Sequence, residues 1–294
     1  MKAAAFGYVR PGSLDGVLAA LADGDAKVLA GGQSLVPVLA MRLGRPATLV
    51  DINSVAELSA LRRVGGVLRI GATVRQRALE HSAEVASVPL LGLALPFVGH
   101  RELRSRGTVC GSLAHADPAA ELPAVACCLG AVLEVAGPAG RRRVPAERFF
   151  AGAMTTEVGP DEVLVAVEFP VADAGEGFGF AEVARRHGDF ALAGVAARVV
   201  VADGRLAAAT LTGFGISDRP VTRDVVALLR AADGAPAALR EATAELAAEV
   251  VDTAGDAHGS TGYRRRLFGV LAARELTRAA DRAHTTPDDP GAPS

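Results

Sequence analysis

The sequence predicts an α+β protein built from two domains, with the larger domain first. Three observations indicate this: strand and helix patterns alternate irregularly, hairpin signals recur, and no G-x-G-x-x-G opens a strand–helix unit, as it would in a doubly wound dinucleotide-binding fold. Near Gly177 the pattern changes to three consecutive strands followed by three helices. We therefore expect one domain over 1–172, a second over 176–282, and a disordered tail over 283–294.

The elements of the larger domain follow from apolar spacing and capping residues, and they divide into subdomains of about 1–55 and 56–172. In the first we expect a helix from Ser13 to Gly24, a strand over 28–30, a helix over 35–43 capped by Ser34, and a strand over 48–52. In the second we expect a strand over 67–72, a helix over 73–79 capped by Thr73, a helical segment over 88–103 broken at Pro96, a helix from Asp117 to Leu129, strands over 131–136 and 141–145 joined by a hairpin at 137–140, and a strand over 162–169.

The smaller domain is predicted as a three-stranded antiparallel sheet followed by a three-helix bundle. Asp203 and Gly204, placed between two apolar runs, form a strong two-residue hairpin signal. The strands are expected over 178–184, 191–201 and 205–213, and the helices over 224–232, 237–251 and 263–280.

Composition narrows the class of protein. Half of the 294 residues are apolar, which is enough for a substantial core, and the formal net charge of −2 gives no reason to expect a nucleic-acid or anionic-membrane partner. The longest apolar stretch, 88–98, contains two prolines and is too short to span a membrane. We interpret the two arginine triplets, 141–143 and 264–266, as solvated faces.

Cysteine and histidine usage indicates a cytoplasmic, metal-free chain. Cys110, Cys127 and Cys128 form no C-x-x-C pair and no disulfide framework, and the six histidines are scattered without metal-ligand spacing. The N-terminus shows no apolar segment preceded by positive charge, so we expect no secretory signal.

Two glycine-rich turns are the most informative feature of the chain. Residues 30–34 (AGGQS) follow a short apolar strand and precede a helix, and residues 108–112 (TVCGS) precede another helix. Residues without side chains let backbone N–H groups surround an anion, and the start of a helix adds unpaired N–H groups. Two such turns predict a clamp on a pyrophosphate, so the expected ligand is a dinucleotide. The alternative for the first turn is an ordinary strand–turn–helix connection in which Gly31 and Gly32 only supply positive φ angles.

Residues near the second turn have both structural and binding interpretations. Asp117 followed by Pro118 is typical of a capped helix start, whereas Glu121, one turn further on, can accept hydrogen bonds from ribose hydroxyls. Cys110 is interpreted as a small residue in place of Gly or Ala, without a redox role. No acid–base pair, nucleophile triad or metal cluster is apparent, so any chemistry must be supplied by a cofactor.

Three stretches of the chain resemble one family. Residues 29–37 (LAGGQSLVP) and 106–123 (RGTVCGSLAHADPAAELP) resemble its two flavin-binding turns, and residues 185–192 (RRHGDFAL) resemble the opening of its C-terminal domain. The family comprises the FAD-binding medium subunits of molybdenum hydroxylases, of the carbon monoxide dehydrogenase and xanthine dehydrogenase type. The likeness extends from Phe6 to about Ala280.

The resemblance implies a PCMH-type FAD-binding domain of two subdomains and a C-terminal flavoprotein domain. It implies that the two turns hold the FAD pyrophosphate, that Glu121 lies near the ribose, and that Leu164 and Phe190 lie near the flavin ring system. The residues expected to bind FAD are Leu29, Ala30, Gly31, Gly32, Gln33, Ser34, Leu35, Val36, Thr108, Val109, Cys110, Gly111, Ser112, Asp117, Glu121, Leu164 and Phe190.

For function, the resemblance implies a FAD-carrying electron-transfer subunit of a molybdenum hydroxylase complex. Substrate would be oxidised on a large molybdopterin-binding partner, and electrons would pass through a small iron–sulfur (2Fe-2S) partner to FAD on this chain and then to an external acceptor. The expected assembly is a dimer of heterotrimers. The three unclustered cysteines agree with iron–sulfur clusters on another chain. The alternatives are a stand-alone FAD-dependent oxidase or reductase of the same superfold, and an assembly module without cofactor.

Overall fold

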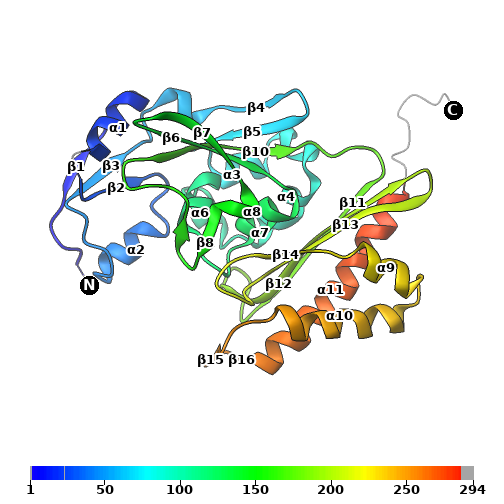
Figure 1. Cartoon of the computed structure of the whole chain (residues 1–294). Coiled ribbons are helices and arrows are strands. Elements are labelled where there is room, and N and C mark those ends of the chain that lie inside the picture. Colours follow the sequence, from blue (N-terminus) through cyan, green and yellow to red (C-terminus); the bar gives the residue numbers. More distant parts are fainter. Residues whose placement is uncertain (1, 23, 286–294) are drawn as a thin grey trace.

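The protein has a mixed α/β fold organised around two hydrophobic clusters (Figure 1). Its structure, a computed structural model, describes residues 2–22 and 24–285. One cluster fills the N-terminal part and also takes in Phe178, Phe180 and Phe214 from the C-terminal sheet. The other lies between that sheet and the last helices. Shared side chains therefore join the two parts of the molecule.

The N-terminal sheet places the first glycine turn. It has three parallel strands in the order β1-β3-β2, of which the first, near the N-terminus, was not expected from the sequence. Helix α1 buries one apolar stripe, Leu14, Val17 and Leu21, as amphipathic spacing predicts. The elements are β1 (Gly7–Val9), α1 (Leu14–Ala22), β2 (Ala26–Leu29), α2 (Leu35–Ala40) and β3 (Thr48–Asp51).

The second sheet is antiparallel throughout, with the order β4-β5-β10-β6-β7, and short helices cover one of its faces (Figure 1). The expected hairpin joins its last two strands, with Gly137 paired to Gly140. The strands are β4 (Leu61–Val64), β5 (Val67–Gly71), β6 (Val132–Gly137), β7 (Gly140–Pro145) and β10 (Val163–Pro170), and a small hairpin is formed by β8 (Phe150–Gly152) and β9 (Thr155–Thr156). The helices are η1 (Ala56–Ser59), α3 (Gln76–Glu80), η2 (Ala83–Ser87), α4 (Pro89–Ala94), η3 (Leu95–Phe97), α5 (Arg101–Arg104), α6 (Val109–His115), α7 (Glu121–Cys128) and α8 (Ala146–Phe149).

Two expected helix starts in this region are wrong. Helix α3 begins at Gln76, because the Thr73 hydroxyl donates to the Leu58 carbonyl, 3.0 Å away, and is not available as a cap. Helix α7 begins at Glu121, because the Asp117 carboxylate accepts the N–H of Ala119 at 2.8 Å and closes a turn before the helix.

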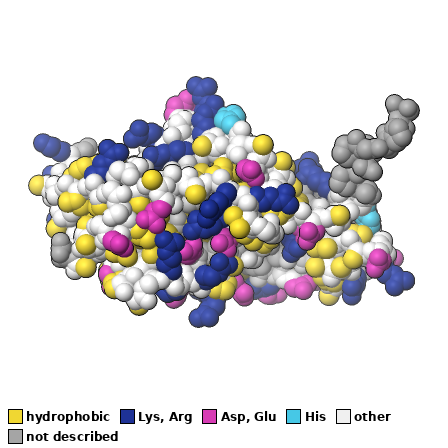
Figure 2. All heavy atoms as spheres, turned by 90° about the horizontal axis from the view of Figure 1, so that it is seen from above, with side chains coloured by type: hydrophobic (Ala, Val, Ile, Leu, Met, Phe, Trp, Pro, Cys, Tyr) yellow, Lys and Arg dark blue, Asp and Glu magenta, His cyan; other side chains and the backbone are white. Residues whose placement is uncertain are grey.

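The first arginine triplet lies on an exposed strand, and each of its members forms an ion pair. Arg141 pairs with Glu134 at 2.7 Å, and the next two arginines pair with glutamates on β10 and just before it. Basic and acidic side chains are accordingly interspersed on the face of the molecule shown in Figure 2. The solvated-face interpretation is confirmed for this triplet.

The C-terminal sheet has four antiparallel strands, in the order β11-β12-β13-β14, rather than the three expected. The fourth was missed because its sequence, VTRD, is short and half charged. The predicted hairpin at Asp203 and Gly204 is confirmed, with φ angles of 51° and 71°. The elements are β11 (Glu176–Ala184), β12 (Ala191–Ala202), β13 (Arg205–Phe214), β14 (Val221–Asp224), α9 (Val226–Ala232), α10 (Pro236–Val250), β15 (Gly255–Asp256), β16 (Gly259–Ser260) and α11 (Thr261–His284).

Helix α11 corrects two expectations. It continues to His284, so the start of the expected tail is helical, whereas 286–294 lie outside the described residues. Arg264, expected on a solvated face, is buried, donates to the carbonyl oxygens of Leu192 and Gly215, and pairs with Asp256 at 2.6 Å. A buried guanidinium that satisfies two chain carbonyls holds the helix to the sheet.

Candidate functional site

The first glycine turn offers a run of unpaired backbone N–H groups. It follows β2 and leads into α2, and Gly32 at its centre has a φ of +75°. Among the described residues, none accepts a hydrogen bond from the N–H groups of residues 31–34, whereas Val36 N–H donates to the Gly32 carbonyl at 2.9 Å. Consecutive free N–H groups in a turn form a concave site that favours an anion.

Ser34 does not cap α2, contrary to expectation. Its backbone is already helical, with φ −93° and ψ −44°, and its side chain makes no capping hydrogen bond. A cap needs an extended backbone that turns the side chain towards the helix N–H groups. Gln33 and Ser34 are exposed, and the Gln33 side-chain amide donates to the Gly31 carbonyl at 3.3 Å.

The second glycine turn is itself the first turn of helix α6. Thr108 is the N-cap, and its hydroxyl oxygen accepts the N–H of Gly111 at 3.0 Å. Val109 N–H donates to the Val74 carbonyl, so within the described structure the amides of Thr108 and Cys110 are the two left free in this turn. The structure thus gives the second turn fewer free donors than the first. Thr108 and Val109 are buried, and Gly111 and Ser112 are half-buried.

The two turns lie against each other. A Cβ placed on Gly31 would overlap the carbonyl oxygen of Arg106 and would lie 2.8 Å from the Cα of Gly107. Only a residue without a side chain allows this approach. The structure therefore brings together two segments that are far apart in the sequence.

A polar bridge, formed by Asn53 and Arg75, connects the two turns. The Asn53 amide donates to the Ala30 carbonyl at 2.8 Å, and its own oxygen accepts from Arg75 at 2.6 Å. Arg75 also donates to the Arg106 carbonyl at 2.5 Å. Sequence reasoning missed this bridge, because neither residue belongs to a glycine turn and the three segments meet only in the fold.

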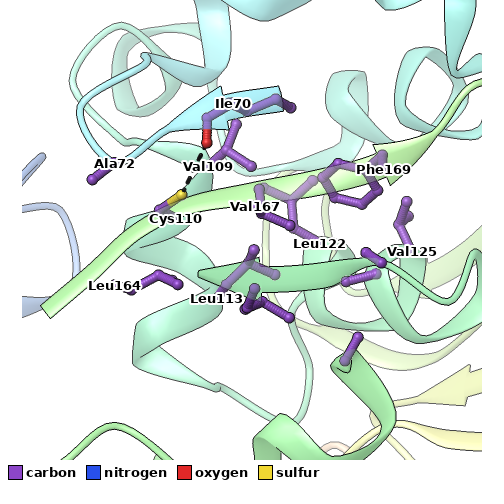
Figure 3. Packing of buried hydrophobic residues seen from close by; sticks show 14 of the residues in the cluster. Ile70, Ala72, Val109, Cys110, Leu113, Leu122, Val125, Leu164, Val167 and Phe169 are labelled. Atoms are coloured by element: carbon purple, nitrogen blue, oxygen red, sulfur yellow. Dashed lines mark hydrogen bonds between the residues drawn. The ribbon is translucent and has the colours of Figure 1, made fainter. Parts of the chain in front are cut away.

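Cys110 and Leu164 belong to the core beneath the second turn (Figure 3). The Cys110 thiol lies 3.6 Å from the Ile70 carbonyl on β5, and burial raises its pKa to about 12. A thiol with so high a pKa is unreactive, which agrees with the interpretation of Cys110 as a small packing residue. Its side chain points into the core and so leaves the outer side of the turn open.

Glu121 is a buried carboxyl at the start of α7. Burial raises its pKa to about 7, helped by the charge of Asp117 and opposed by that of Arg104. Glu121 follows the end of α6 by a short connection. Phe190, by contrast, is 71 % exposed in the segment between β11 and β12. It is not among the residues of the N-terminal hydrophobic cluster.

Other features of the described residues lie apart from this site. A hollow of about 640 Å³ is lined by residues 217–223 and by 249, 250 and 252. Within the described ranges no group of three or more His, Cys, Asp or Glu residues could hold a metal ion. None of the described helices is both long and apolar enough to cross a bilayer.

Comparison with known families decides the assignment. Residues 4–172 match the family described as the FAD binding domain in molybdopterin dehydrogenase, and residues 178–279 match the CO dehydrogenase flavoprotein C-terminal domain. The chain belongs to the FAD-binding medium subunits of the molybdenum hydroxylases. The family expected from the sequence motifs is thereby confirmed.

Relatives of this medium subunit match it over almost their whole length. It is 36 % identical to 6-hydroxypseudooxynicotine dehydrogenase complex subunit alpha of Paenarthrobacter nicotinovorans, over 97 % of this chain and 98 % of that one. It is 31 % identical to the carbon monoxide dehydrogenase medium chain of Afipia carboxidovorans, over 95 % and 98 %. Among solved structures, quinoline 2-oxidoreductase of Pseudomonas putida 86 matches with a TM-score of 0.89 and 38 % identity, over 97 % of this chain and 100 % of that one.

Proposed function

We propose that this chain is the FAD-carrying electron-transfer subunit of a molybdenum hydroxylase complex. The observation that carries the proposal is the first glycine turn, whose four unpaired N–H groups lie directly beside the second turn. A diphosphate needs several donors and room for its oxygens, and Gly31 and Gly32 contribute backbone N–H groups without a side chain in the way. The family to which the chain belongs agrees with this choice of ligand.

The residues of this chain would bind and orient the cofactor. The N–H groups of residues 31–34 would hold the diphosphate, and the Asn53–Arg75 bridge would keep the second turn in register with the first. Glu121 would accept hydrogen bonds from ribose hydroxyls, and Phe190 would cover the ring system. FAD supplies the redox chemistry when bound, because it exchanges electrons singly or in pairs.

The iron–sulfur and molybdenum centres would belong to partner chains. The described cysteines are free thiols, and burial raises the pKa of Cys127 and Cys128 to about 12, as it does for Cys110. Most Fe–S clusters are held by four cysteine thiolates, and these three residues cannot supply that number. A small iron–sulfur subunit and a large molybdopterin-binding subunit, in a dimer of heterotrimers, complete the proposal.

Domain limits and location form part of the same proposal. We place the FAD-binding domain at 1–172, with subdomains of about 1–55 and 56–172, and the C-terminal domain at 176–282. These limits are supported by the sheets, because the two subdomains and the C-terminal domain each have a main sheet of their own. A cytoplasmic location is supported by the cysteines, none of which forms a disulfide in the described part of the chain.

Purification of the full chain from its source organism tests this function. A tagged chain should co-purify with two companions, one containing a 2Fe-2S chromophore and one containing molybdopterin, and should carry about one FAD per chain. A chain that purifies alone and oxidises a small substrate would instead be a stand-alone flavoenzyme. A colourless chain found with the two companions would be an assembly module.

A further inference from the structure

The three-stranded parallel sheet ends beside the first glycine turn. Strand β2 pairs with β3 as far as Leu29 and Asp51, and the Ile52 N–H donates to the Leu29 carbonyl at 3.1 Å. Ala30 is therefore the first residue whose carbonyl lies beyond this ladder. The Asn53 side chain donates to that carbonyl at 2.8 Å. A side-chain amide thus takes the place of the next backbone N–H that a longer strand would supply.

The hydrogen bond to Ala30 decides which way the turn presents its first N–H group. In a trans peptide the carbonyl oxygen and the following N–H point in opposite directions. With the Ala30 carbonyl held by Asn53, the Gly31 N–H points to the opposite side, where no described residue accepts it. The next two carbonyls of the turn are held as well, by the Gln33 side chain and by the Val36 N–H. The direction of the free donors is therefore fixed by what binds the carbonyls behind them.

Asp51 and Tyr8 keep the Asn53 amide in this orientation. The Oδ1 atom of the buried Asp51 carboxylate accepts the Asn53 backbone N–H at 2.9 Å and its side-chain Nδ2 at 2.6 Å. The Oδ2 atom accepts the Tyr8 hydroxyl and lies 3.9 Å from Arg10. Burial alone would raise the pKa of Asp51, but the hydrogen bonds from Tyr8 and Asn53 lower it, so the carboxyl is ionised at neutral pH. An ionised carboxylate only accepts hydrogen bonds and so holds the amide nitrogen, rather than the amide oxygen, on its side.

We propose that Asp51 is a positioning residue for FAD binding, which acts through Asn53 on the first glycine turn. Tyr8 supports it from the exposed edge strand β1. The inference rests on the proposed function, because it takes the diphosphate of FAD as the ligand of the turn. It gives a role in cofactor binding to two residues that belong to neither glycine motif.

Two substitutions of Asp51 test the proposal in the full chain. Asp51→Ala frees the Asn53 side chain, so FAD affinity should fall about tenfold or more, as expected for the loss of hydrogen bonds to a charged group. Asp51→Asn keeps an acceptor oxygen at the same reach, so affinity should stay within about threefold of wild type. FAD affinity is measured by the quenching of flavin fluorescence after the bound cofactor has been removed.

The direction of the change separates positioning from a plain effect of charge. If Asp51 acted only by its negative charge, its removal would strengthen the binding of a nearby diphosphate, and both variants would bind FAD more tightly than wild type. Positioning predicts instead that Asp51→Ala binds FAD more weakly and that the uncharged Asp51→Asn restores the affinity.

Glu134 in the second sheet provides a matched control. Its side chain is 15 % exposed, against 11 % for Asp51, and it pairs with Arg69 at 2.6 Å. Glu134→Ala should lower the melting temperature, as Asp51→Ala does, but should leave FAD affinity unchanged. If Asp51→Ala binds FAD as tightly as wild type or more tightly, or if Glu134→Ala loses as much affinity, the proposal for Asp51 is wrong and the proposed function stands.

Tyr8→Phe decides the matter if Asp51→Ala does not fold. The Tyr8 ring is exposed, so the sheet stays intact, and the loss of one hydrogen bond to the Asp51 carboxylate should weaken FAD binding about threefold. Unchanged affinity in Tyr8→Phe would then overturn the proposal. If wild type itself binds no FAD, the proposed function fails first.

Discussion

Gly31 lies so close to Arg106 that any side chain on Gly31 would overlap the Arg106 carbonyl oxygen. The two residues are in different subdomains of the proposed division, and each belongs to one of the two turns or borders it. Their contact explains why the pattern Gly-Gly is required in a turn whose second glycine alone has a positive φ. Gly31 is needed for the close approach, and Gly32 for the backbone angle.

Gly31→Ala should therefore separate the turns and release FAD. We expect FAD affinity to fall by about tenfold or more, because a shift of roughly 1 Å in a binding constellation has effects of that size. Gly12→Ala is the matched control, since a Cβ there meets nothing within 4 Å. Flavin content of the purified variants, read from absorbance, is the measurement. Equal flavin content in both variants would show that contact between the turns is not needed for binding.

Arg75→Met should loosen the bridge between the turns. It leaves the Arg106 carbonyl and the Asn53 side chain without their partner, and each lost hydrogen bond to a charged group weakens the fold by about 1.5–3 kcal/mol. Urea denaturation and FAD titration should both show the loss. Arg62→Met, on an exposed position of β4, should change neither. An Arg75→Met chain with wild-type FAD affinity would limit the bridge to a role in folding.

Glu121 and Glu182 should make the FAD-free chain less stable as pH rises. Burial raises the pKa values of Glu121 and Glu182 to about 7 and about 8, while an unfolded glutamate titrates near its usual pKa of about 4.3. Between these values the folded chain holds more protons, so its stability is greatest at the acidic end and falls until pH reaches about 8. Each retained proton contributes a slope of up to about 1.4 kcal/mol per pH unit.

The pH effect is isolated by comparison with a variant in which both carboxyls become amides. Glu121→Gln combined with Glu182→Gln should lose the decline in stability between about pH 6 and pH 8. Asp117 and Arg104, the other charged groups that act on Glu121, stay in place in this comparison. An unchanged decline in the double variant would assign it to other groups.

Much of the fold could be predicted because local signals agreed with tertiary structure. The hairpins at 137–140 and 203–204 depend on residues that tolerate positive φ, and that requirement is visible in the sequence. The amphipathic helix α1 and the apolar strand β10 are likewise local patterns. Family membership followed from two motifs that are long enough to be specific.

The rest of the site depends on contacts that no local pattern encodes. Ser34 and Thr73 have the chemistry of helix caps, but the backbone angles of one and a competing carbonyl for the other prevent capping. Arg264 looked like one of three solvated arginines, and only the path of α11 across the sheet buries it. The bridge through Asn53 arises where distant segments meet, and so does the buried Oε2 atom of Glu182, which has no hydrogen-bond partner among the described residues.

A structure of the full chain with FAD bound tests the central claim most directly. The account predicts that the diphosphate oxygens lie within hydrogen-bond distance of the backbone N–H groups of residues 31–34, next to the first turn of α6. A diphosphate held elsewhere, with those amides still facing solvent, would contradict it.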